Sequence, residues 1–417
     1  MSERVMVIGG GVIGAMSAWN LVQAGCDVTI VDQAEFGAAC SHGNCGYVSP
    51  SHALPLTRPG QIKATLKEMF KRNSTFAIKP RLSAESLGWF WRFGRRCNAT
   101  DMLDAARGRN AMLQSSKHLY QELIRDQKID CEWKEVGILF VFDTPAGFEH
   151  YEATERLIQK EFGVSATPYD GDKLVELEPA LKPGLGGAWH YEGDCHLRPD
   201  KLMSSLRTKL ESQGVTFLEK TAVKRFVTEA GQVRAIATDH QEFEADKFVV
   251  ATGAWTPFLN QHLGCKIPIE PGKGYSLTMP TPARMPKIPL IFEDAHVAIT
   301  PMETKYRIGS TMEFVGYDTS INPARLELLK TSATKYLHDP YCEPIEEKWY
   351  GWRPMTWDGK PIIDRSPLLK NVWIAAGHNM LGISMATGTG KLVRELMLDE
   401  KPHLDPSYFS IARLRKN

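Results

Sequence analysis

The sequence predicts a mixed fold, in which an α/β part built from three separate stretches of chain carries an inserted α+β part with an antiparallel sheet. Two observations predict it. Strand-like and helix-like segments alternate within the first 32 residues, and the alternation returns after residue 200 and again near the C-terminus. Residues 267–315 instead contain many short strand-like runs and prolines, which is typical of an antiparallel sheet.

The first 32 residues read as one strand–turn–helix–strand unit. An apolar strand over residues 4–8 leads directly into the pattern Gly-x-Gly-x-x-Gly at residues 9–14. A helix over 15–23 and a second strand over 27–31 follow, and the second strand ends at Asp32. An acid about twenty residues after such a glycine pattern is typical of a Rossmann-type dinucleotide site. The alternative interpretation is a glycine-rich turn in an unrelated sheet.

Each part of this unit has a physical role in holding a dinucleotide. Gly9 allows the tight turn, Gly11 lets a pyrophosphate approach the backbone, and Gly14 lets the helix pack on the sheet. The helix N-terminus presents unpaired N–H groups that suit a diphosphate. Asp32 can accept hydrogen bonds from a ribose 2′-hydroxyl and disfavours a 2′-phosphate, so NADP is not expected.

Composition excludes several classes of protein. A chain of 417 residues with 43% hydrophobic and 24% charged residues is expected to fold into two or three domains. The net charge of +1 gives no global case for nucleic acid as a partner. No apolar run approaches the ~20 residues of a membrane span. The glycine pattern starts too early to leave room for a signal peptide, so we expect a cytoplasmic protein with eight free cysteines and no metal site.

Periodicity places the remaining elements. Helices are predicted at 61–72, 83–97, 102–128, 146–162, 200–212, 323–338 and 383–398, and strands at 136–142, 215–218, 221–227, 232–238, 243–250 and 372–375. We predict that the nucleotide-binding domain comprises residues 1–60, 191–264 and 346–417, and that residues 61–190 and 265–345 form the inserted substrate-binding domain.

Four further segments decide which dinucleotide is expected. They are residues 39–50, 249–255, 351–361 and 375–390, which contain Ser-His-Gly-Asn, Ala-Thr-Gly-Ala-Trp, Gly-Trp-Arg-Pro and Gly-His-Asn-Met-Leu-Gly respectively. Together and in this order they resemble the D-amino-acid oxidase/dehydrogenase and glycine oxidase family of flavoproteins, and the closest likeness is to the bacterial D-amino-acid dehydrogenases. The resemblance covers nearly the whole chain and implies FAD as the cofactor. Since no cysteine follows Cys342, we expect FAD to be bound non-covalently.

The resemblance implies that the cofactor contacts come from all of these segments. A helix that begins after residues 377–382 would direct its N-terminus at the flavin and stabilise negative charge there. For Val223 a plain core position is an equal alternative. The implied cofactor contacts are Gly9, Gly11, Val12, Ile13, Gly14, Asp32, Gln33, Ser41, His42, Asn44, Gly46, Val223, Ala251, Thr252, Gly253, Trp255, Arg353, Gly377, Asn379, Met380, Leu381, Gly382 and Ile383.

Three residues are candidates for substrate binding. The resemblance implies that Arg353 binds the α-carboxylate of the substrate, which a guanidinium can do with two parallel hydrogen bonds, and the alternative is a structural salt bridge. Tyr275 either adds a hydroxyl to that carboxylate or belongs to the core. His378 either acts as a ligand or base, or hydrogen-bonds within its turn. Arg307 is predicted to be a charge on a strand surface rather than a ligand.

The implied reaction is the oxidation of an amine next to a carboxylate, by hydride transfer from Cα to flavin N5, with no essential general base. The expected substrate is a small D-amino acid, with D-proline and hydroxy-D-proline as candidates, and a quinone or other carrier is the expected electron acceptor. The alternatives are a glycine/sarcosine-type oxidase that uses oxygen, a flavin-dependent RNA-modifying enzyme and a non-catalytic flavin-binding subunit. The sequence leaves the oligomeric state open.

One segment bears on location in the cell. Residues 58–96 contain ten Lys and Arg against two Asp and Glu, together with the run Trp-Phe-Trp-Arg-Phe. This composition either marks a peripheral contact with the inner face of a membrane or a solvated face above a buried aromatic stripe.

Overall fold

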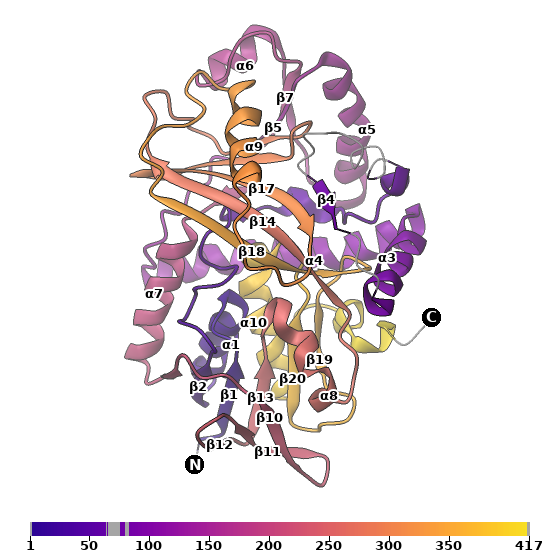
Figure 1. Cartoon of the computed structure of the whole chain (residues 1–417), viewed down its shortest axis with the longest axis vertical. Coiled ribbons are helices and arrows are strands. Elements are labelled where there is room, and N and C mark those ends of the chain that lie inside the picture. The colour runs from indigo at the N-terminus through magenta and orange to yellow at the C-terminus, as the bar shows by residue number, and fades with distance from the viewer. Residues whose placement is uncertain (1, 64, 66–75, 80–82, 415–417) are drawn as a thin grey trace.

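The computed structural model describes residues 2–63, 65, 76–79 and 83–414. Figure 1 shows a parallel sheet at one end of the long axis and a largely antiparallel sheet at the other, so the predicted combination of α/β and α+β architecture is confirmed. Among the described helices, none has the length and hydropathy that a membrane span requires.

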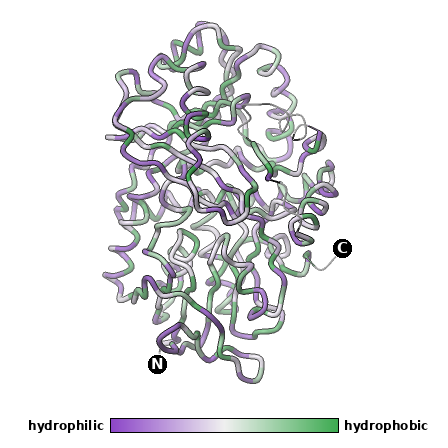
Figure 2. The backbone as a smooth tube through the Cα atoms, in the orientation of Figure 1, coloured by the Kyte–Doolittle hydropathy of each residue, from purple (hydrophilic) through white to green (hydrophobic). Residues whose placement is uncertain are grey.

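The parallel sheet has six strands in the order β19-β20-β13-β1-β2-β9. Its strands are β1 (Arg4–Ile8), β2 (Asp27–Val31), β9 (Thr216–Leu218), β13 (Lys247–Val250), β19 (Ile362–Arg365) and β20 (Val372–Ala376). Only β19 runs antiparallel to its neighbour. The sheet therefore joins segments from the start, the middle and the end of the chain. Its strands carry mostly hydrophobic residues, because both faces are covered (Figure 2).

Two helices cover one face of this sheet. Helix α1 (Val12–Gln23) packs against α10 (Gly382–Met397), and α10 packs against α4 (Ala99–Gln127). Gly390 makes the close approach of α1 and α10 feasible, because a Cβ at this position would lie 2.3 Å from the carbonyl oxygen of Met16. The N-termini of α1 and α10 lie at the edge of the sheet that faces the second part of the molecule (Figure 1).

The second sheet follows the order β18-β14-β17-β16-β15-β5-β7-β6, with β4 paired to β17. Its strands are β4 (Phe76–Ile78), β5 (Ile138–Phe142), β6 (Thr167–Tyr169), β7 (Gly187–Tyr191), β14 (Ile269–Pro280), β15 (Leu290–Phe292), β16 (Val297–Pro301), β17 (Lys305–Phe314) and β18 (Glu347–Thr356). Helix α9 (Pro323–Thr334) buries Leu326 and Leu329 against the strands. The core of the inserted part is thus one sheet with helices packed on it.

The remaining elements are shorter or peripheral. They are α3 (Ala84–Arg96), α5 (Pro145–Phe162), α6 (Gly171–Leu177), α7 (Pro199–Ser212), α8 (Asn260–Leu263), the pair β3 (Tyr47–Val48) and β8 (Cys195–His196), the three-stranded sheet β10 (Arg225–Glu229), β11 (Gln232–Ala237) and β12 (Glu242–Glu244), and the 3-10 helices η1 (Pro50–Ala53), η2 (Gly253–Leu259), η3 (Pro406–Phe409) and η4 (Ile411–Leu414).

The structure corrects two of the predicted strands and describes only part of one predicted helix. Residues 243–250 do not form one strand, because the chain turns at Asp246, whose carboxylate accepts a 2.8 Å hydrogen bond from the backbone of Arg4, and separates β12 from β13. The strand predicted at 221–227 begins only at Arg225. Of the helix predicted at 61–72, residues 61–63 and 65 are helical, and the rest lie outside the described residues.

Candidate cofactor and substrate site

A large cavity lies where the two sheets meet. Its volume is about 1380 Å³, above the roughly 300–1,000 Å³ of a pocket for one drug-sized ligand, so it has room for a dinucleotide and a small second ligand. The cavity wall contains every predicted cofactor contact except Gly14, His42 and Gly377. It also contains the predicted substrate residues Tyr275, Arg353 and His378.

The glycine turn after β1 is sterically required. Gly9 has a φ of +114°, and a Cβ there would lie 2.4 Å from the carbonyl oxygen of Ala251. A Cβ at Gly14 would lie 1.8 Å from the carbonyl oxygen of Gly9, so Gly14 acts through packing and not through the cavity wall. Gly11 precedes α1 without a side-chain cap of its own, and Ser41 accepts a 2.9 Å hydrogen bond from the N–H of Val12. Ser41 thus caps the first N–H of α1, and Gly11 and Ile13 beside it lie in the cavity wall.

Asp32 is held in place by backbone groups on both sides of it. One carboxylate oxygen accepts a 2.6 Å hydrogen bond from the N–H of Gly10, and the other accepts a 2.8 Å hydrogen bond from the N–H of Ala34. These bonds fix the carboxylate in the cavity wall at the end of β2. Since each carboxylate oxygen has a second lone pair, the group can still accept a hydrogen bond from a ribose hydroxyl.

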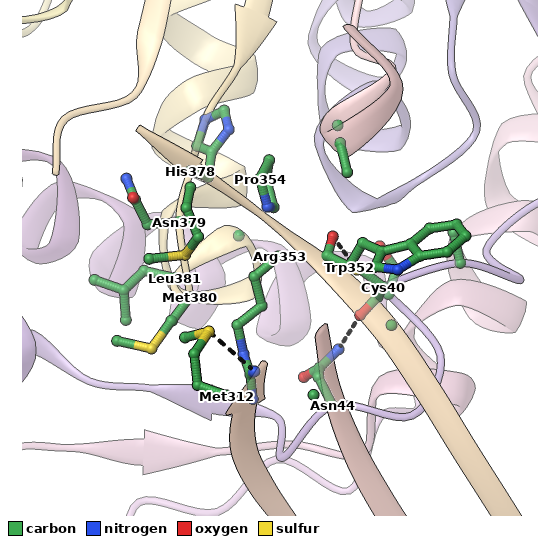
Figure 3. Close-up of a pocket in the computed structure, with 18 of the residues that line it drawn as sticks. Cys40, Asn44, Met312, Trp352, Arg353, Pro354, His378, Asn379, Met380 and Leu381 are labelled. Atoms are coloured by element: carbon green, nitrogen blue, oxygen red, sulfur yellow. Dashed lines mark hydrogen bonds between the residues drawn. The ribbon is translucent and has the colours of Figure 1, made fainter. Parts of the chain in front are cut away.

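Arg353 extends into the cavity from β18. In Figure 3 its side chain points toward Met312, to which its Nη1 makes a 3.8 Å contact at the sulfur. Nη1 also donates a 2.8 Å hydrogen bond to the carbonyl oxygen of Thr311. Gly274 on the neighbouring strand leaves the space for the guanidinium, because a Cβ there would lie 2.2 Å from Nη1. Burial lowers the pKa of Arg353.

The charge of Arg353 lacks an anionic partner in the described part of the chain. Its nearest titratable neighbours are the thiols of Cys40 and Cys45, and burial raises the pKa of both thiols, that of Cys40 to about 12. Both thiols are therefore neutral near pH 7. The alternative role, a structural salt bridge, is not found among the described residues. A half-buried cation of this kind, which faces a cavity, is a site for a ligand anion.

Tyr275 lies in the cavity wall, but its hydroxyl is already engaged. It donates a 2.8 Å hydrogen bond to Glu313, and Glu313 also accepts a 2.5 Å hydrogen bond from Arg325. Burial raises the pKa of Tyr275, so the phenol is neutral. To donate to a substrate carboxylate, as predicted, the hydroxyl would have to exchange its partner.

His378 and Asn379 shape the turn before α10. The Nε2 of His378 lies 3.0 Å from the hydroxyl of Thr389, and burial lowers the pKa of this histidine to about 3, so it is neutral. The amide of Asn379 donates to the carbonyl oxygen of Gly377 and accepts from the N–H of Thr356. These side-chain bonds support the turn from within, and a role of His378 as a substrate ligand stays a prediction.

The predicted position of Arg307 was wrong. It was expected to be a charge on a strand surface, but only 2% of it is exposed. Strand β17 lies between β14 and β16, so both of its edges are paired, and the loop that contains His42 and Asn44 covers the Arg307 side chain. The guanidinium donates to the carbonyl oxygens of His42 and Asn44 and to the hydroxyl of Thr278. Arg307 therefore anchors the loop that forms one wall of the cavity.

His42 belongs to the same loop but lies outside the cavity wall. Its Nε2 lies 2.6 Å from Glu347, and this hydrogen bond raises the pKa of His42. Asn44 and Ser41 on the same loop do reach the wall. His42 thus fastens the loop from the outside, and a direct contact with the cofactor stays a prediction.

The cavity wall also contains four titratable residues that the sequence did not predict as site residues. His52 follows β3, Arg58 lies six residues later, and Glu293 and His296 occupy the turn between β15 and β16. Burial lowers the pKa of His52 to about 3, and burial raises the pKa of Glu293, an effect that His296 and Arg58 oppose. No spacing signal joins these residues, because two distant turns bring them together.

Comparison with known proteins agrees with this arrangement. The model of the family described as DAO, FAD dependent oxidoreductase, matches residues 4–396. The chain belongs to this family. FAD is accordingly its cofactor, and it is an oxidoreductase.

Solved structures share the fold of this oxidoreductase. Glycine oxidase from Geobacillus kaustophilus superposes with a TM-score of 0.78 at 22% identity, over 99% of each chain. L-proline dehydrogenase from P. horikoshii superposes with a TM-score of 0.75 at 21% identity, over 100% of this chain and 98% of the other. Glycine oxidase from Bacillus cereus superposes with a TM-score of 0.74 at 20% identity, over 96% of this chain and 97% of the other.

The residues of the cavity wall in this oxidoreductase fit FAD independently of the family match. Three buried polar atoms in its wall have no hydrogen-bond partner among the described residues: Ser49 Oγ, Thr311 Oγ1 and Trp352 Nε1. Buried polar groups are nearly always paired in proteins, so these atoms indicate a polar ligand. The N-terminus of α10 has no side-chain cap, and that of α1 has only the hydroxyl of Ser41; both lie in the cavity wall and suit an electron-rich ring and a pyrophosphate.

Proposed function

We propose that this oxidoreductase oxidises a small D-amino acid at the bond between Cα and nitrogen, with D-proline and hydroxy-D-proline as the candidate substrates and a quinone or other carrier as the electron acceptor. The observation that supports this proposal most directly is the guanidinium of Arg353 in the FAD cavity, which has no anionic partner among the described residues. Solved structures of the same fold include a glycine oxidase and an L-proline dehydrogenase, both named for amino-acid substrates.

Arg353 would fix the substrate by its carboxylate. Its Nη1 is held by Thr311, which leaves Nε and Nη2 to donate to a ligand. A guanidinium holds a carboxylate by two parallel bonds, and this geometry orients the attached Cα. Orientation of this kind can supply much of the rate enhancement, so the proposal needs no essential general base.

The wall around Arg353 suits a small, mainly apolar side chain or ring. The sulfur of Met312 lies 3.8 Å from the guanidinium, and Met380 and Leu381 belong to the same cavity wall (Figure 3). Thioether side chains adapt to the shape of a ligand and exclude water from it. This combination of one cation and several apolar side chains favours a monocarboxylic amino acid over one with a charged side chain.

When bound, FAD supplies the two-electron acceptor for this oxidation. The substrate must present its amine in the neutral form, and the product imine is then hydrolysed to a 2-oxo acid and ammonia. A cyclic amino acid such as D-proline would give a cyclic imine. The N-terminus of α10 would stabilise negative charge on the ring side of the cavity.

We further propose that FAD is held without a covalent bond. The cysteines that reach the cavity wall, Cys40 and Cys45, are neutral thiols, and no cysteine follows Cys342 in the chain. Acid precipitation of the purified protein should release all of the flavin into the supernatant. Flavin that stays with the pellet would contradict this part of the proposal.

A panel of amino acids tests the substrate and the acceptor together. The panel contains D- and L-proline, hydroxy-D-proline, D-alanine, glycine and sarcosine, and each is assayed with an artificial dye and in an oxygen electrode. We expect dye reduction with a D-amino acid and little oxygen uptake. Rapid oxygen uptake with glycine or sarcosine would instead support the alternative, an oxidase of the glycine/sarcosine type. Inactivity with the whole panel would overturn both.

A further inference from the structure

Helix α3 has two apolar faces, and only the inner one is explained by packing. On the inner face Trp89 is 5% exposed, stacks on Phe93 at 5.4 Å and contacts Phe314 at 5.7 Å. Its ring nitrogen donates a 3.1 Å hydrogen bond to the carbonyl oxygen of Pro268. These contacts account for the buried aromatic stripe of this segment.

The outer face of α3 carries large apolar side chains in contact with solvent. Leu87 is 57% exposed and Trp91, one turn later on the same face, is 58% exposed. Ile62, 47% exposed, lies against α3, because a Cβ at Gly94 would lie 3.3 Å from its terminal carbon. The helix lies at the periphery of the molecule (Figure 1). Packing within the described chain gives no reason for this apolar surface.

The exposed residues continue into the FAD cavity. Ile62 and Leu87 both belong to the cavity wall, together with Phe90, Phe93 and Gly94. Because Ile62 and Leu87 are exposed and also line the cavity, they form part of an apolar rim of the cavity. A rim of this kind suits contact with an apolar phase more than contact with water.

Positive charge surrounds this rim. The guanidinium of Arg95 lies 4.9 Å from the ring centre of Trp91, and Lys63 and Arg92 have no carboxylate partner in the described part of the chain. The nearby acid Glu85 lies 3.7 Å from Lys266. Exposed tryptophan and leucine beside these cations complement a surface that is apolar inside and anionic outside.

We propose that the outer face of α3, formed by Ile62, Lys63, Leu87, Trp91, Arg92 and Arg95, docks on an anionic lipid bilayer. Trp91 and Leu87 would enter the interface between headgroups and acyl chains, and Arg92 and Arg95 would pair with lipid phosphates. Docking in this way places the apolar mouth of the cavity against the bilayer, within reach of a membrane-dissolved electron acceptor. The docking itself does not depend on which substrate the enzyme oxidises.

Co-sedimentation of the holoenzyme with vesicles tests the docking. The vesicles contain either phosphatidylcholine alone or phosphatidylcholine with phosphatidylglycerol, at low and at high salt. We expect the enzyme to pellet with the anionic vesicles at low salt, and Trp91→Glu to lower its partition coefficient at least roughly ten-fold. Arg92→Ser/Arg95→Ser should remove most of the salt dependence.

Leu368→Glu is the matched control, because Leu368 is 59% exposed, lies next to Gly264 and is not among the six residues of the proposed face. It should bind vesicles as the wild type does. Trp91 lies outside the cavity wall, so Trp91→Glu should keep its flavin content and its activity with a soluble dye. Equal binding of Trp91→Glu and wild type, equal binding to both vesicle types, or no pelleting at either salt would each overturn the proposal. A concentration-dependent dimer that Trp91→Glu abolishes, seen without vesicle binding, would assign the face to a second copy of the chain and also overturn it.

Discussion

Gly274 offers a test of Arg353 that leaves the arginine in the protein. The two residues lie diagonally across the paired strands β14 and β18, in which Gly272 is opposite Arg353 and Gly274 is opposite Gly351. A Cβ at Gly274 would lie 2.2 Å from Nη1 and 2.5 Å from Cζ of Arg353. Gly274 has no positive φ, so the backbone can accept alanine. In Gly274→Ala the guanidinium, the movable end of a long side chain, has to give way.

The size of the effect follows from this geometry. Ordinary contact begins at 3.4 Å, so the guanidinium must move by about 1 Å. A displacement of ~1 Å at a group that positions the substrate can cost about 100-fold in rate, which corresponds to about 2.7 kcal/mol of transition-state stabilisation. We therefore expect kcat/KM for the best D-amino acid of the panel to fall by about two orders of magnitude. Flavin content and thermal stability should change little.

The assay is steady-state dye reduction with holoenzyme of matched flavin content. Gly272→Ala is the control on the same strand, because its Cβ would lie 2.6 Å from the sulfur of Met312 instead of from Arg353. Because a thioether adapts more readily than a guanidinium, kcat/KM of the control should fall by less than about ten-fold. The reasoning is refuted if Gly274→Ala, with its flavin bound, keeps the kcat/KM of the wild type.

Three further predictions concern the cofactor, the pH dependence of stability and the anchored loop. Asp32→Ala should raise the Kd for FAD by roughly 10- to 100-fold, because a charge-assisted hydrogen bond contributes about 1.5–3 kcal/mol, and an unchanged Kd in a fluorescence titration would refute the ribose contact. Burial raises the pKa of Asp194 from its ordinary 3.8 to about 7, so the protonated form stabilises the folded state fully below pH ~4, and this stabilisation is lost as the pH rises through about 7. Asp194→Asn should therefore become more stable relative to the wild type by about 4 kcal/mol between pH 4 and pH 8 in urea unfolding, and a constant difference would speak against the buried acid. Arg307→Met should lower the free energy of unfolding by about 3 kcal/mol and weaken FAD binding, since it leaves the carbonyl oxygens of the loop unpaired and removes the 3.6 Å ion pair with Glu347, and a melting temperature equal to that of the wild type would show that the loop needs no such anchor.

The nucleotide-binding unit could be predicted because its signals lie within one short stretch of the sequence. The spacing of Gly9, Gly11 and Gly14 and the acid at Asp32 are properties of one short stretch, and the structure builds from that stretch the turn that the spacing predicts. The long helices were predictable for the same reason, because their periodicity lies within a single segment.

Pairing between distant strands could not be predicted in the same way. The run at 243–250 has the composition of one strand, but its first part pairs with β11, and its last part enters the parallel sheet between β1 and β20. The burial of Arg307 depends on a loop more than 260 residues earlier in the chain, which contains His42 and Asn44, and the space for Arg353 depends on the register of β14 against β18. A sequence pattern contains neither the neighbours of a strand nor its register.

The central claim, that the chain oxidises an amino acid whose carboxylate is held by Arg353, is tested most directly by anaerobic reduction of the bound flavin. Wild-type holoenzyme and Arg353→Lys are each mixed with the preferred D-amino acid and its L-enantiomer, and the visible absorption of the flavin is followed. The wild type should bleach with the D-amino acid. Arg353→Lys, which keeps the charge but loses the paired hydrogen bonds, should stay yellow at the same concentration. A wild-type flavin that no amino acid bleaches, or a lysine variant that bleaches at the wild-type rate, would contradict the claim.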